Sequence, residues 1–359
     1  MALAQPKEFG LSIQRPSLST ILNTTDSLGG DIKKIAELLD DINPIYTDAP
    51  CIEANNGEYH ETAYRVSLPK AYVIGYNEGI PSSFGEIGHK TEKMAMFGSR
   101  LEMDYKLMRD KEAGKRYRID QMVQHVKQLS RALSHEIFYG TASDKSFDGL
   151  ANRYNSLDPK VNSYASQVVN AKSKTSKGNY SSIYAVKWGA NSIHGIHPKG
   201  VSNIIMHEDF GRAMVPDGRG NTMGALVDEY TLYYGIAIPD PRAVVRICNI
   251  DTQELENGVG IGDPQPAKGE RNLFGIIRRA MGTLMDPDDQ GDAGRLVIYA
   301  SRQVIACLQE LSTNASLRNG VFREIYASER ANANVPEWEY AGMKFKVCDA
   351  ISNDEVEVV

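Results

Sequence analysis

Residues 72–86 read YVIGYNEGIPSSFGE, a strand-like run that breaks into a tip rich in glycine and proline. Upstream, from Thr62, apolar and polar residues alternate, and the alternation resumes after Pro69 as far as Tyr76. A period of two is typical of a β-strand, so we expect one arm of a hairpin here. The tip is too long for a two-residue turn, and it contains four turn formers: Gly79, Pro81, Gly85 and Gly88.

The second arm is predicted to return over residues 101–107. Apolar residues there alternate with charged ones: Leu101, Met103, Tyr105 and Leu107. Each arm would run about 40 Å, and a lone two-stranded hairpin is at best marginally stable in water. We therefore expect the hairpin to rest on another copy of the chain, with a mobile loop at its tip.

A helical period follows the basic run Lys111–Arg118. The apolar residues fall on one stripe of a helix of about 22 residues that ends at Gly140: Ile119, Met122, Val123, Val126, Leu129, Leu133 and Ile137. The basic run is interpreted as a solvated bend, with an inward face near nucleic acid as the alternative.

The rest of the chain reads as a mixture of strands and helices. Residues 1–57 look like an arm with one short helix at Asp31–Asp41, and polar residues 158–182 look like a surface loop. Tyr230–Ile250 is a long extended stretch that Pro239 and Pro241 should kink. The other predicted elements are strands Ile183–Gly189, Val201–His207 and Arg295–Ala300, helices Asn272–Leu284 and Ser301–Leu311, and closing strands around residues 343–351 and 356–359.

Composition indicates a folded, water-soluble protein. The 359 residues are 42% hydrophobic and 24% charged, and the formal net charge is -6. Acidity argues against a protein that grips nucleic acid through many phosphate contacts. No signal peptide and no apolar run long enough to span a bilayer is visible, so we expect folding in a cytoplasm.

The cysteines lie far apart and form no Cys-x-x-Cys pair: Cys51, Cys248, Cys307 and Cys348. Neither a disulfide scaffold nor a zinc ribbon is indicated, and we expect them to be buried as small hydrophobic residues.

Two stretches resemble metal sites only in part. His194 and His197, with the run His207-Glu208-Asp209 downstream, fit no helical His-x-x-x-His spacing. Residues 286–292 read DPDDQGD, like the start of a calcium loop, but Val297 occupies the twelfth position, where a glutamate ligand belongs. We interpret the histidines as surface or core residues and the acidic run as an exposed loop.

Two other motifs lack the residues or the setting that their chemistry requires. Gly258–Gly262 (GVGIG) lacks the Lys-Ser/Thr of a P-loop and runs into Asp263-Pro264. Ser134-His135 lies within the predicted helix and does not suggest a triad. We therefore predict no catalytic, cofactor-binding or metal-binding residues, no cofactor and no enzyme activity.

Six stretches resemble the major capsid proteins of tailed bacteriophages, whose shared α+β architecture is called the Johnson fold. They are GYNEGIPSSFGE (75–86), RYRIDQMVQHVKQLSRALSHEIFYG (116–140), FDGLANRYNSL (147–157), KWGANSIHGIHPKG (187–200), YYGIAIPDPRAVVRICNI (233–250) and YAGMKFKVCDAISNDEVEVV (340–359). The similarity covers nearly everything after about residue 55.

The resemblance implies a domain order. It gives an N-terminal arm (1–57), an extended-loop hairpin (58–112), a spine helix with the start of a peripheral domain (113–157), a first axial part (158–229) with a surface insertion (158–182), peripheral long strands (230–270), a second axial part (271–334) and closing C-terminal strands (335–359). The insertion and the arm match nothing in that family that we can name.

The resemblance also implies a shell protein of the virion. Copies would form the pentamers and hexamers of an icosahedral capsid around packaged double-stranded DNA, with weak non-specific DNA contact and no membrane. A portal protein, a separate scaffolding protein and a decoration protein are the expected partners, and assembly would occur in the host cytoplasm. Because only about 57 residues precede the hairpin, we expect no large scaffolding domain fused at the N-terminus.

Two alternatives remain open at this point. One is an encapsulin-type nanocompartment shell with the same fold, and the other is a hydrolase whose site escapes motif detection. Some members of the capsid family join subunits by a lysine-asparagine isopeptide bond, for which Lys70 and Lys90 are candidates without a named partner.

Overall fold

The computed structural model describes most of the chain after residue 44. The described residues are 45, 48–57, 59–65, 67–109, 111–143, 145–173, 178–200, 205–217, 219–266, 271–284, 295–313, 323–325, 337–340 and 342–359. The predicted helix Asp31–Asp41 and the acidic loop at 286–292 lie outside them. Two compact units are present. Of the described residues, unit 1 holds those within Phe97–Leu129 and Ile205–Leu232, and unit 2 holds all the others.

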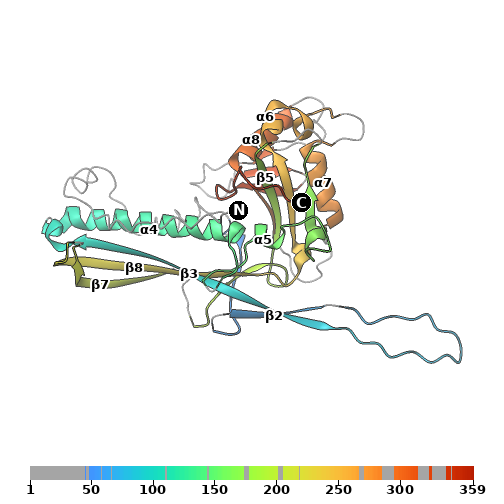
Figure 1. Ribbon diagram of the computed structural model, residues 1–359, viewed down its shortest axis with the longest axis horizontal. Helices are drawn as coiled ribbons and strands as arrows, with labels where there is room; N and C mark the ends of the chain where they lie inside the picture. Colours follow the sequence, from blue (N-terminus) through green and yellow to red (C-terminus); the bar gives the residue numbers. More distant parts are fainter. Residues whose placement is uncertain are drawn as a thin grey trace, which may run out of the picture. The chain divides into compact units, whose positions relative to one another are not determined.

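The hairpin exists, but its arms differ from the prediction. Strand β2 (Tyr59–Arg65) pairs antiparallel with the first half of β3 (Ile87–Asp104), and Tyr64 lies opposite Gly88. Residues 72–76 are coil, and Tyr105 and Leu107 belong to the 3-10 helix η1 (Tyr105–Arg109). The alternation at 72–76 gives no strand because no second strand pairs with it, as Figure 1 shows for the open loop beyond β2.

Helix α4 (Lys111–Tyr139) begins earlier than predicted. The basic run is its first turns and not a bend, since Lys, Glu, Ala and Arg are all good helix formers. The predicted end at Gly140 is confirmed: a Cβ there would lie 2.5 Å from the carbonyl oxygen of Glu136. Four residues of the predicted apolar stripe are buried: Val126, Leu129, Leu133 and Ile137.

A seven-stranded sheet forms the centre of unit 2, in the order β11-β12-β13-β10-β5-β9-β4. Its strands are β4 (Val168–Asn170), β5 (Tyr180–Trp188), β9 (Val244–Asp251), β10 (Arg295–Ala300), β11 (Arg323–Ile325), β12 (Glu337–Tyr340) and β13 (Met343–Val347). Strand β4 lies within the predicted loop 158–182, so that stretch is not all loop. Strand β13 pairs with β12, and residues 356–359 form no strand, so the predicted closing pair is wrong in its second member.

The remaining strands form a six-stranded sheet in the order β1-β6-β8-β3-β2, with β7 paired to β8. Their bounds are β1 (Cys51–Glu53), β6 (His194–His197), β7 (Ile205–Pro216) and β8 (Thr222–Ala237). Between β8 and β9 the chain bends at Pro239 and through η3 (Pro241–Ala243), as the prolines predicted. The short helices are α5 (Leu150–Arg153), α6 (Thr252–Asn257), η2 (Ala165–Gln167) and η4 (Gly260–Gly262).

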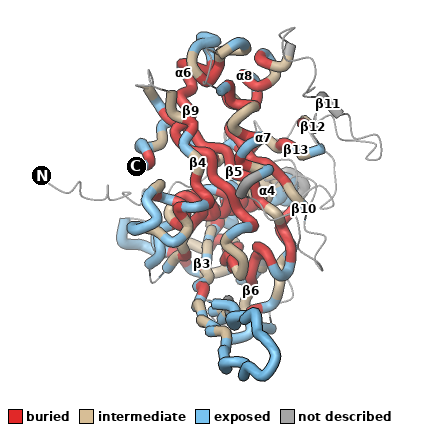
Figure 2. The backbone as a smooth tube through the Cα atoms, turned by 90° about the vertical axis from the view of Figure 1, so that its right-hand side faces the viewer, coloured by how far each residue is buried: buried red, intermediate tan, exposed pale blue. Residues whose placement is uncertain are grey.

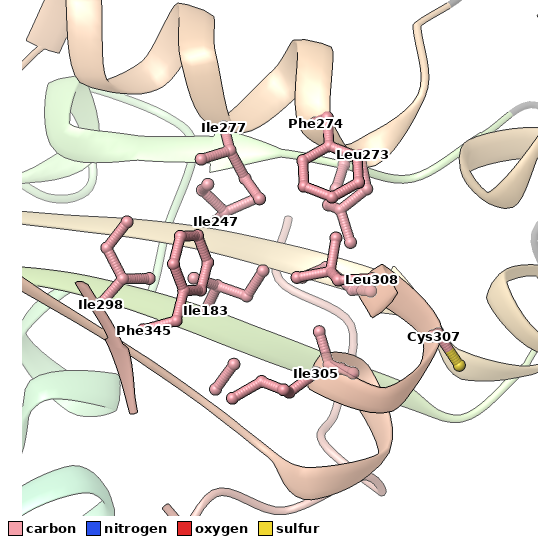
Figure 3. Packing of buried hydrophobic residues seen from close by; sticks show 14 of the residues in the cluster. Ile183, Ile247, Leu273, Phe274, Ile277, Ile298, Ile305, Cys307, Leu308 and Phe345 are labelled. Carbon is pink, nitrogen blue, oxygen red and sulfur yellow. The ribbon is translucent and has the colours of Figure 1, made fainter. Parts of the chain in front are cut away.

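Helices α7 (Leu273–Leu284) and α8 (Arg302–Thr313) cover one face of the seven-stranded sheet. Ile183 and Ile247 are opposite each other in the register, and Ile298 lies opposite Phe345, so these side chains share that face. Figure 3 shows them between the two helices. Strand β9 is buried throughout and β5 nearly so, which makes them the red centre of Figure 2.

The other face of the sheet holds a buried ion pair. Arg246 of β9 donates to Glu355 Oε2 at 2.9 Å, and both side chains are only 5% exposed. The same guanidinium donates to the carbonyl oxygens of Ala151 and Tyr154. Glu355 also accepts the hydroxyl proton of Tyr139, the last residue of α4, at 2.5 Å. This face is therefore closed by polar contacts to the end of α4 and to the last residues of the chain.

Glu355 makes one isolated bridge to Tyr180 of β5, and residues 356–359 lie beside β9 without forming a strand. Asn249 exchanges two hydrogen bonds with the backbone of Val358, at 2.8 Å each. The backbone nitrogen of Leu157 donates to the Val359 oxygen at 3.1 Å. A side chain thus replaces the missing strand partner, which is why a strand-like sequence here forms no ladder.

Unit 1 is organised around a buried carboxylate. Asp228 of β8 is 1% exposed and accepts two hydrogen bonds from Arg118 of α4, at 2.5 and 2.6 Å. His207 Nε2 lies 2.9 Å from the same carboxylate. Tyr230 is stacked between the rings of His207 and His125, with centroids 4.8 and 5.7 Å away. These contacts tie α4 to β7 and β8 within the unit.

The buried pair Arg246–Glu355 can be tested against an exposed pair of similar geometry. Replacing Arg246 by Met should lower the free energy of unfolding by about 3–5 kcal/mol, because it leaves an uncompensated buried carboxylate. The control is Arg302→Met, whose pair with Asp349 has side chains 74% and 68% exposed. That variant should lose about 1 kcal/mol or less. Equal losses in urea denaturation would contradict the assigned importance of burial.

The pH dependence of stability should include His125. Burial lowers its pKa below the usual 6.5, and the charge of Asp228 offsets only part of this. The unfolded chain therefore binds the proton first, and the contribution of neutral His125 to stability is lost as the pH falls below about 6.5. We expect the urea midpoint to fall less in His125→Gln than in the native chain between about pH 7.5 and 5.5. Identical pH dependence in the two proteins would rule His125 out.

Candidate assembly interface

Residues 67–86 form a long two-armed coil, named here the apolar loop. Its arms lie side by side through a few contacts: Ser67 donates its backbone N–H to the oxygen of Glu86 at 3.3 Å, and Ser83 Oγ donates to the oxygen of Lys70 at 2.9 Å. A Cβ at Gly85 would lie 2.7 Å from the oxygen of Ser67, so only glycine permits this approach. The loop therefore has a defined path without a hydrogen-bonded ladder.

A tight turn closes the tip. The backbone nitrogen of Gly75 donates to Glu78 Oε2 at 2.7 Å, and Asn77 takes the left-handed conformation at φ 68°. Asparagine is among the few residues other than glycine that adopt this conformation readily. The Gly-Tyr-Asn-Glu sequence thus determines the tip locally.

The apolar side chains of the loop are not buried by its own chain. Val73 and Tyr76 are fully exposed, at 103% and 102%, and Phe84 is 83% exposed. The pale-blue loop at the bottom of Figure 2 shows the same exposure along the backbone. The other large hydrophobic residues exposed in and beside the loop are Leu68, Tyr72, Ile74, Ile80 and Ile87. So many apolar side chains on one segment mark a surface that binds protein.

A buried ion pair fixes the base of this hairpin. Glu92 of β3 and Arg153 of α5 form a bidentate pair, with both N–O distances 2.7 Å and both side chains 5% exposed. Lys90 Nζ lies 2.8 Å from the same carboxylate. Burial raises the pKa of Glu92, but the hydrogen bonds and charge of Arg153, with the charge of Lys90, lower it below its usual value. Glu92 is therefore ionised at neutral pH.

Arg153 links that base to other parts of unit 2. Its Nε donates to the Asp148 oxygen at 2.8 Å, and one terminal nitrogen lies 3.4 Å from the Ile236 oxygen of β8. The neighbouring Asn152 donates to the oxygen of Gly140, where α4 ends. The stretch FDGLANRYNSL thus joins the hairpin, the end of α4 and β8 through polar contacts.

The predicted metal candidates do not form a cluster. His194 is buried and packs edge-on against His60, with ring centroids 5.6 Å apart. His197 Nδ1 lies 3.1 Å from the oxygen of Pro198, and His207 belongs to unit 1, beside Asp228. Among the described residues, no group of three or more His, Cys, Asp or Glu side chains could hold a metal ion.

The glycine-rich and serine-histidine motifs have structural positions. Gly258 ends α6 in the left-handed conformation at φ 66°, and Gly260–Gly262 is the following 3-10 turn. Ser134 donates to the oxygen of Ser130 one turn earlier, and His135 lies against Tyr139.

The cysteines and the candidate cross-linking lysines are also placed. All four cysteines are free thiols, and three are buried as predicted, whereas Cys51 is half-buried. Burial raises the pKa of Cys248 and Cys307 to about 11, which keeps them protonated. Lys90 is held at the hairpin base by Glu92 and Tyr164, and Lys70 lies in the apolar loop.

Sequence reasoning missed the pairs that position the loop. Glu92 and Arg153 are 61 residues apart, and Arg246 and Glu355 are 109 apart. The predicted hairpin left Glu92 in its connecting loop, so the only signal in the sequence was that Arg153 stands within the motif FDGLANRYNSL. No helix in the described part of the chain has the length and apolar character that a membrane span requires.

Comparisons with known proteins agree with the fold. The chain matches the family described as Major capsid protein GP7 over residues 27–359. It is similar to a chain in a structure of bacteriophage Epsilon15, with a TM-score of 0.67 and 23% identity over 96% of this chain and 98% of that one. A chain of the bacteriophage JBD30 capsid gives a TM-score of 0.43 and 10% identity, over 81% and 89% respectively. No curated protein matches the chain.

The family match spans almost the whole described chain, and the Epsilon15 likeness confirms the α+β capsid fold expected from the sequence. A capsid protein is a component of the virion that assembles from many copies, and neither the nanocompartment nor the hydrolase alternative is favoured. The chain therefore belongs to the Major capsid protein GP7 family and is a major capsid protein of a tailed bacteriophage with the Johnson fold.

Proposed function

We propose that the apolar loop docks onto a neighbouring copy of the chain, and that this contact builds the closed icosahedral shell around the double-stranded DNA genome. The observation that carries the proposal is the exposure of the loop: Val73, Tyr76 and Phe84 have no partner side chains around them that exclude water. A folded monomer gains nothing from such side chains in water. A second copy can bury them, and stable interfaces of this kind are rich in aromatic residues.

The buried pair Glu92–Arg153 gives the loop a fixed starting direction. Because β2 and β3 pair only up to Arg65 and Ile87, everything beyond depends on the orientation of this base. A charged hydrogen-bonded pair with two contacts restricts direction better than apolar packing does. The hairpin base thus holds the apolar loop rigidly, and the apolar side chains of the loop become buried only on assembly.

The other partners follow from the same role. We propose a portal protein, a separate scaffolding protein and a decoration protein as partners, and assembly in the host cytoplasm. Residues 183–216 and 273–330 would lie at the centres of pentamers and hexamers, and the N-terminal arm would reach a neighbouring subunit. The role is structural and needs no catalytic residue or cofactor.

Of the two lysines considered for a covalent link between subunits, Lys70 is the better candidate, because it lies in the apolar loop while Lys90 is engaged by Glu92. Bands heavier than the single chain on a denaturing gel of intact particles would support such a link. A single band at the monomer mass would exclude it.

Charged substitutions in the apolar loop should stop assembly without unfolding the subunit. In Val73→Asp/Tyr76→Asp both altered side chains are already fully exposed, so the thermal unfolding temperature should not change. Particles seen by negative-stain microscopy and sedimentation should be lost, because two carboxylates would have to be buried at the new interface. The matched control is Val161→Asp, 74% exposed outside the loop, which should still form particles. Normal assembly of the double variant would refute the docking role.

Loss of the ion pair Glu92–Arg153 should increase the mobility of the hairpin base. Arg153→Met leaves Glu92 buried without its bidentate partner, so amide hydrogen exchange in residues 87–93 should accelerate at least tenfold relative to the native chain. The control is Arg242→Met, whose partner Asp240 is 34% exposed and whose own side chain is 57% exposed. Unchanged exchange at 87–93 in Arg153→Met would show that apolar packing, and not the ion pair, holds the hairpin.

A further inference from the structure

Residues 158–167, called here the polar segment, have one defined shape although the sequence indicated only a surface loop. The backbone nitrogens of Val161 and Asn162 donate to the Asp158 oxygen at 3.0 and 3.1 Å. The backbone nitrogen of Tyr164 donates to Asn162 Oδ1 at 2.9 Å, and η2 follows. Side-chain and backbone hydrogen bonds thus fix this turn locally, and it can act as a firm support for its neighbours.

The polar segment is attached to the chain around Arg153. Asn162 Nδ2 donates to the Arg153 oxygen at 2.7 Å. The ring of Tyr164 lies against Tyr154, with centroids 5.4 Å apart, and Tyr154 is completely buried. The segment is therefore joined to the same stretch of chain that binds Glu92 through the Arg153 side chain.

Tyr164 also contacts the hairpin. Its hydroxyl oxygen accepts a hydrogen bond from Lys90 Nζ at 3.1 Å, and the same ammonium lies 5.4 Å from the centre of its ring. Lys90 belongs to β3 and lies opposite Thr62 of β2. Both contacts attract the ammonium toward the polar segment.

Two contacts on one face of β3 fix a direction, whereas one contact fixes only a point. Lys90 and Glu92 are two residues apart, so their side chains leave the same face of the strand, about 6.6 Å apart at about 3.3 Å per residue. Arg153 binds Glu92, and Tyr164 binds Lys90 on the side nearer the apolar loop. Without the second contact, the hairpin can rotate more freely about the Glu92–Arg153 pair.

The length of the apolar loop magnifies any such rotation. From Glu86 to Tyr76 the chain spans up to about 33 Å, at about 3.3 Å per residue, and Figure 1 shows the loop extending away from β2 and β3. A rotation of about 10° at the base would move the tip by about 6 Å. Because apolar contact requires heavy atoms within about 4.0–4.5 Å, such a shift is enough to separate the loop from the surface that covers it.

Tyr164 is not needed to neutralise a buried charge. Lys90 keeps Glu92 as its ion-pair partner at 2.8 Å, and Glu92 keeps Arg153. The Lys90 side chain is also 31% exposed, so water can replace the lost contacts. Loss of the Tyr164 ring should therefore change the direction of the loop more than the stability of the unit.

We propose that Tyr164 is a positioning residue for shell assembly, which holds Lys90 and thereby sets the direction of the apolar loop. This role rests on the proposed function, in which the loop docks onto a neighbouring copy. Tyr164 contacts no neighbouring copy itself and acts through Lys90.

The direction of the loop can be measured in the unassembled full chain with two spin labels. One label is placed at Ser82→Cys in the loop, and the other at Gly282→Cys, an exposed position of α7 where a Cβ meets nothing within 4 Å. The half-buried Cys51 is replaced by Ser, and the other three cysteines are buried. Double electron-electron resonance then gives the distribution of distances between the labels.

The native chain should give a narrow distribution, and Tyr164→Leu one that is broader by about 6 Å, the displacement expected at the tip. Tyr164→Phe keeps the ring against Tyr154 and beside Lys90, so it should restore the narrow distribution. The control Tyr105→Leu loses a cation–π contact of the same kind with Arg212 in unit 1 and should stay narrow. Equal widths in the native chain and Tyr164→Leu would overturn the proposal.

Two further measurements separate positioning from folding. The thermal unfolding temperature of Tyr164→Leu should fall by less than about 4 °C, while the protein concentration needed for particles in sedimentation should rise at least about threefold. Tyr164→Phe should bring that concentration back to within about twofold of the native value. A narrow distance distribution with impaired assembly would identify Tyr164 as part of the contact surface itself and would overturn the positioning role.

If Tyr164→Leu does not fold by circular dichroism, Asn162→Ala is the second variant. It detaches the polar segment from the Arg153 oxygen and should broaden the same distribution, and an unchanged width would overturn the proposal. The distance measurement uses the subunit and does not depend on shell formation. A native chain that forms no particles would refute the proposed function, and the distance distributions would still decide whether Tyr164 sets the direction of the loop.

Discussion

The apolar loop imposes the constraint on which the rest of the structure depends. Residues 67–86 carry large hydrophobic side chains that unit 2 leaves in water, so the lowest free energy of the chain is reached only when another molecule covers them. The direction of such a segment relative to its own unit must also be fixed, because a freely moving apolar loop would bind its own chain or aggregate. The polar contacts at the hairpin base meet that second need. The exposed apolar loop therefore favours assembly, and the buried ion pair at the hairpin base keeps the loop in a fixed direction.

Buried charge is used repeatedly for this purpose. Glu92–Arg153, Arg246–Glu355 and Asp228–Arg118 each join segments far apart in the chain. Such pairs contribute little net stability compared with apolar residues of similar volume. They do fix one geometry, because any other alignment would leave a buried charge without its partner. In unit 2 they attach the hairpin, the end of α4 and residues 355–359 to a sheet whose other face is packed by α7 and α8. The apolar core provides most of the stability, and the ion pairs determine where the distant segments lie.

Much of this fold was predictable from local pattern. The helix end at Gly140, the strands at Ile183 and Arg295, and the bend at Pro239 and Pro241 follow from periodicity and from backbone rules for glycine and proline. The start of α4 was placed too late because its first turns are charged and carry no apolar stripe. The alternation at 72–76 misled because pairing needs a partner strand at the right distance, which no local pattern encodes. The three buried ion pairs connect residues 61 to 110 positions apart, and sequence periodicity contains no information about such contacts.

The burial of the apolar loop on assembly can be measured directly. Hydroxyl-radical footprinting with mass spectrometry reports the solvent exposure of Tyr76 and Phe84 in the isolated subunit and in intact particles. Strong reactivity in the subunit and protection in the particle, with Val161 unchanged, is the expected result. Equal reactivity of Tyr76 and Phe84 in both forms would mean that no second copy covers the loop, and the central claim would be wrong.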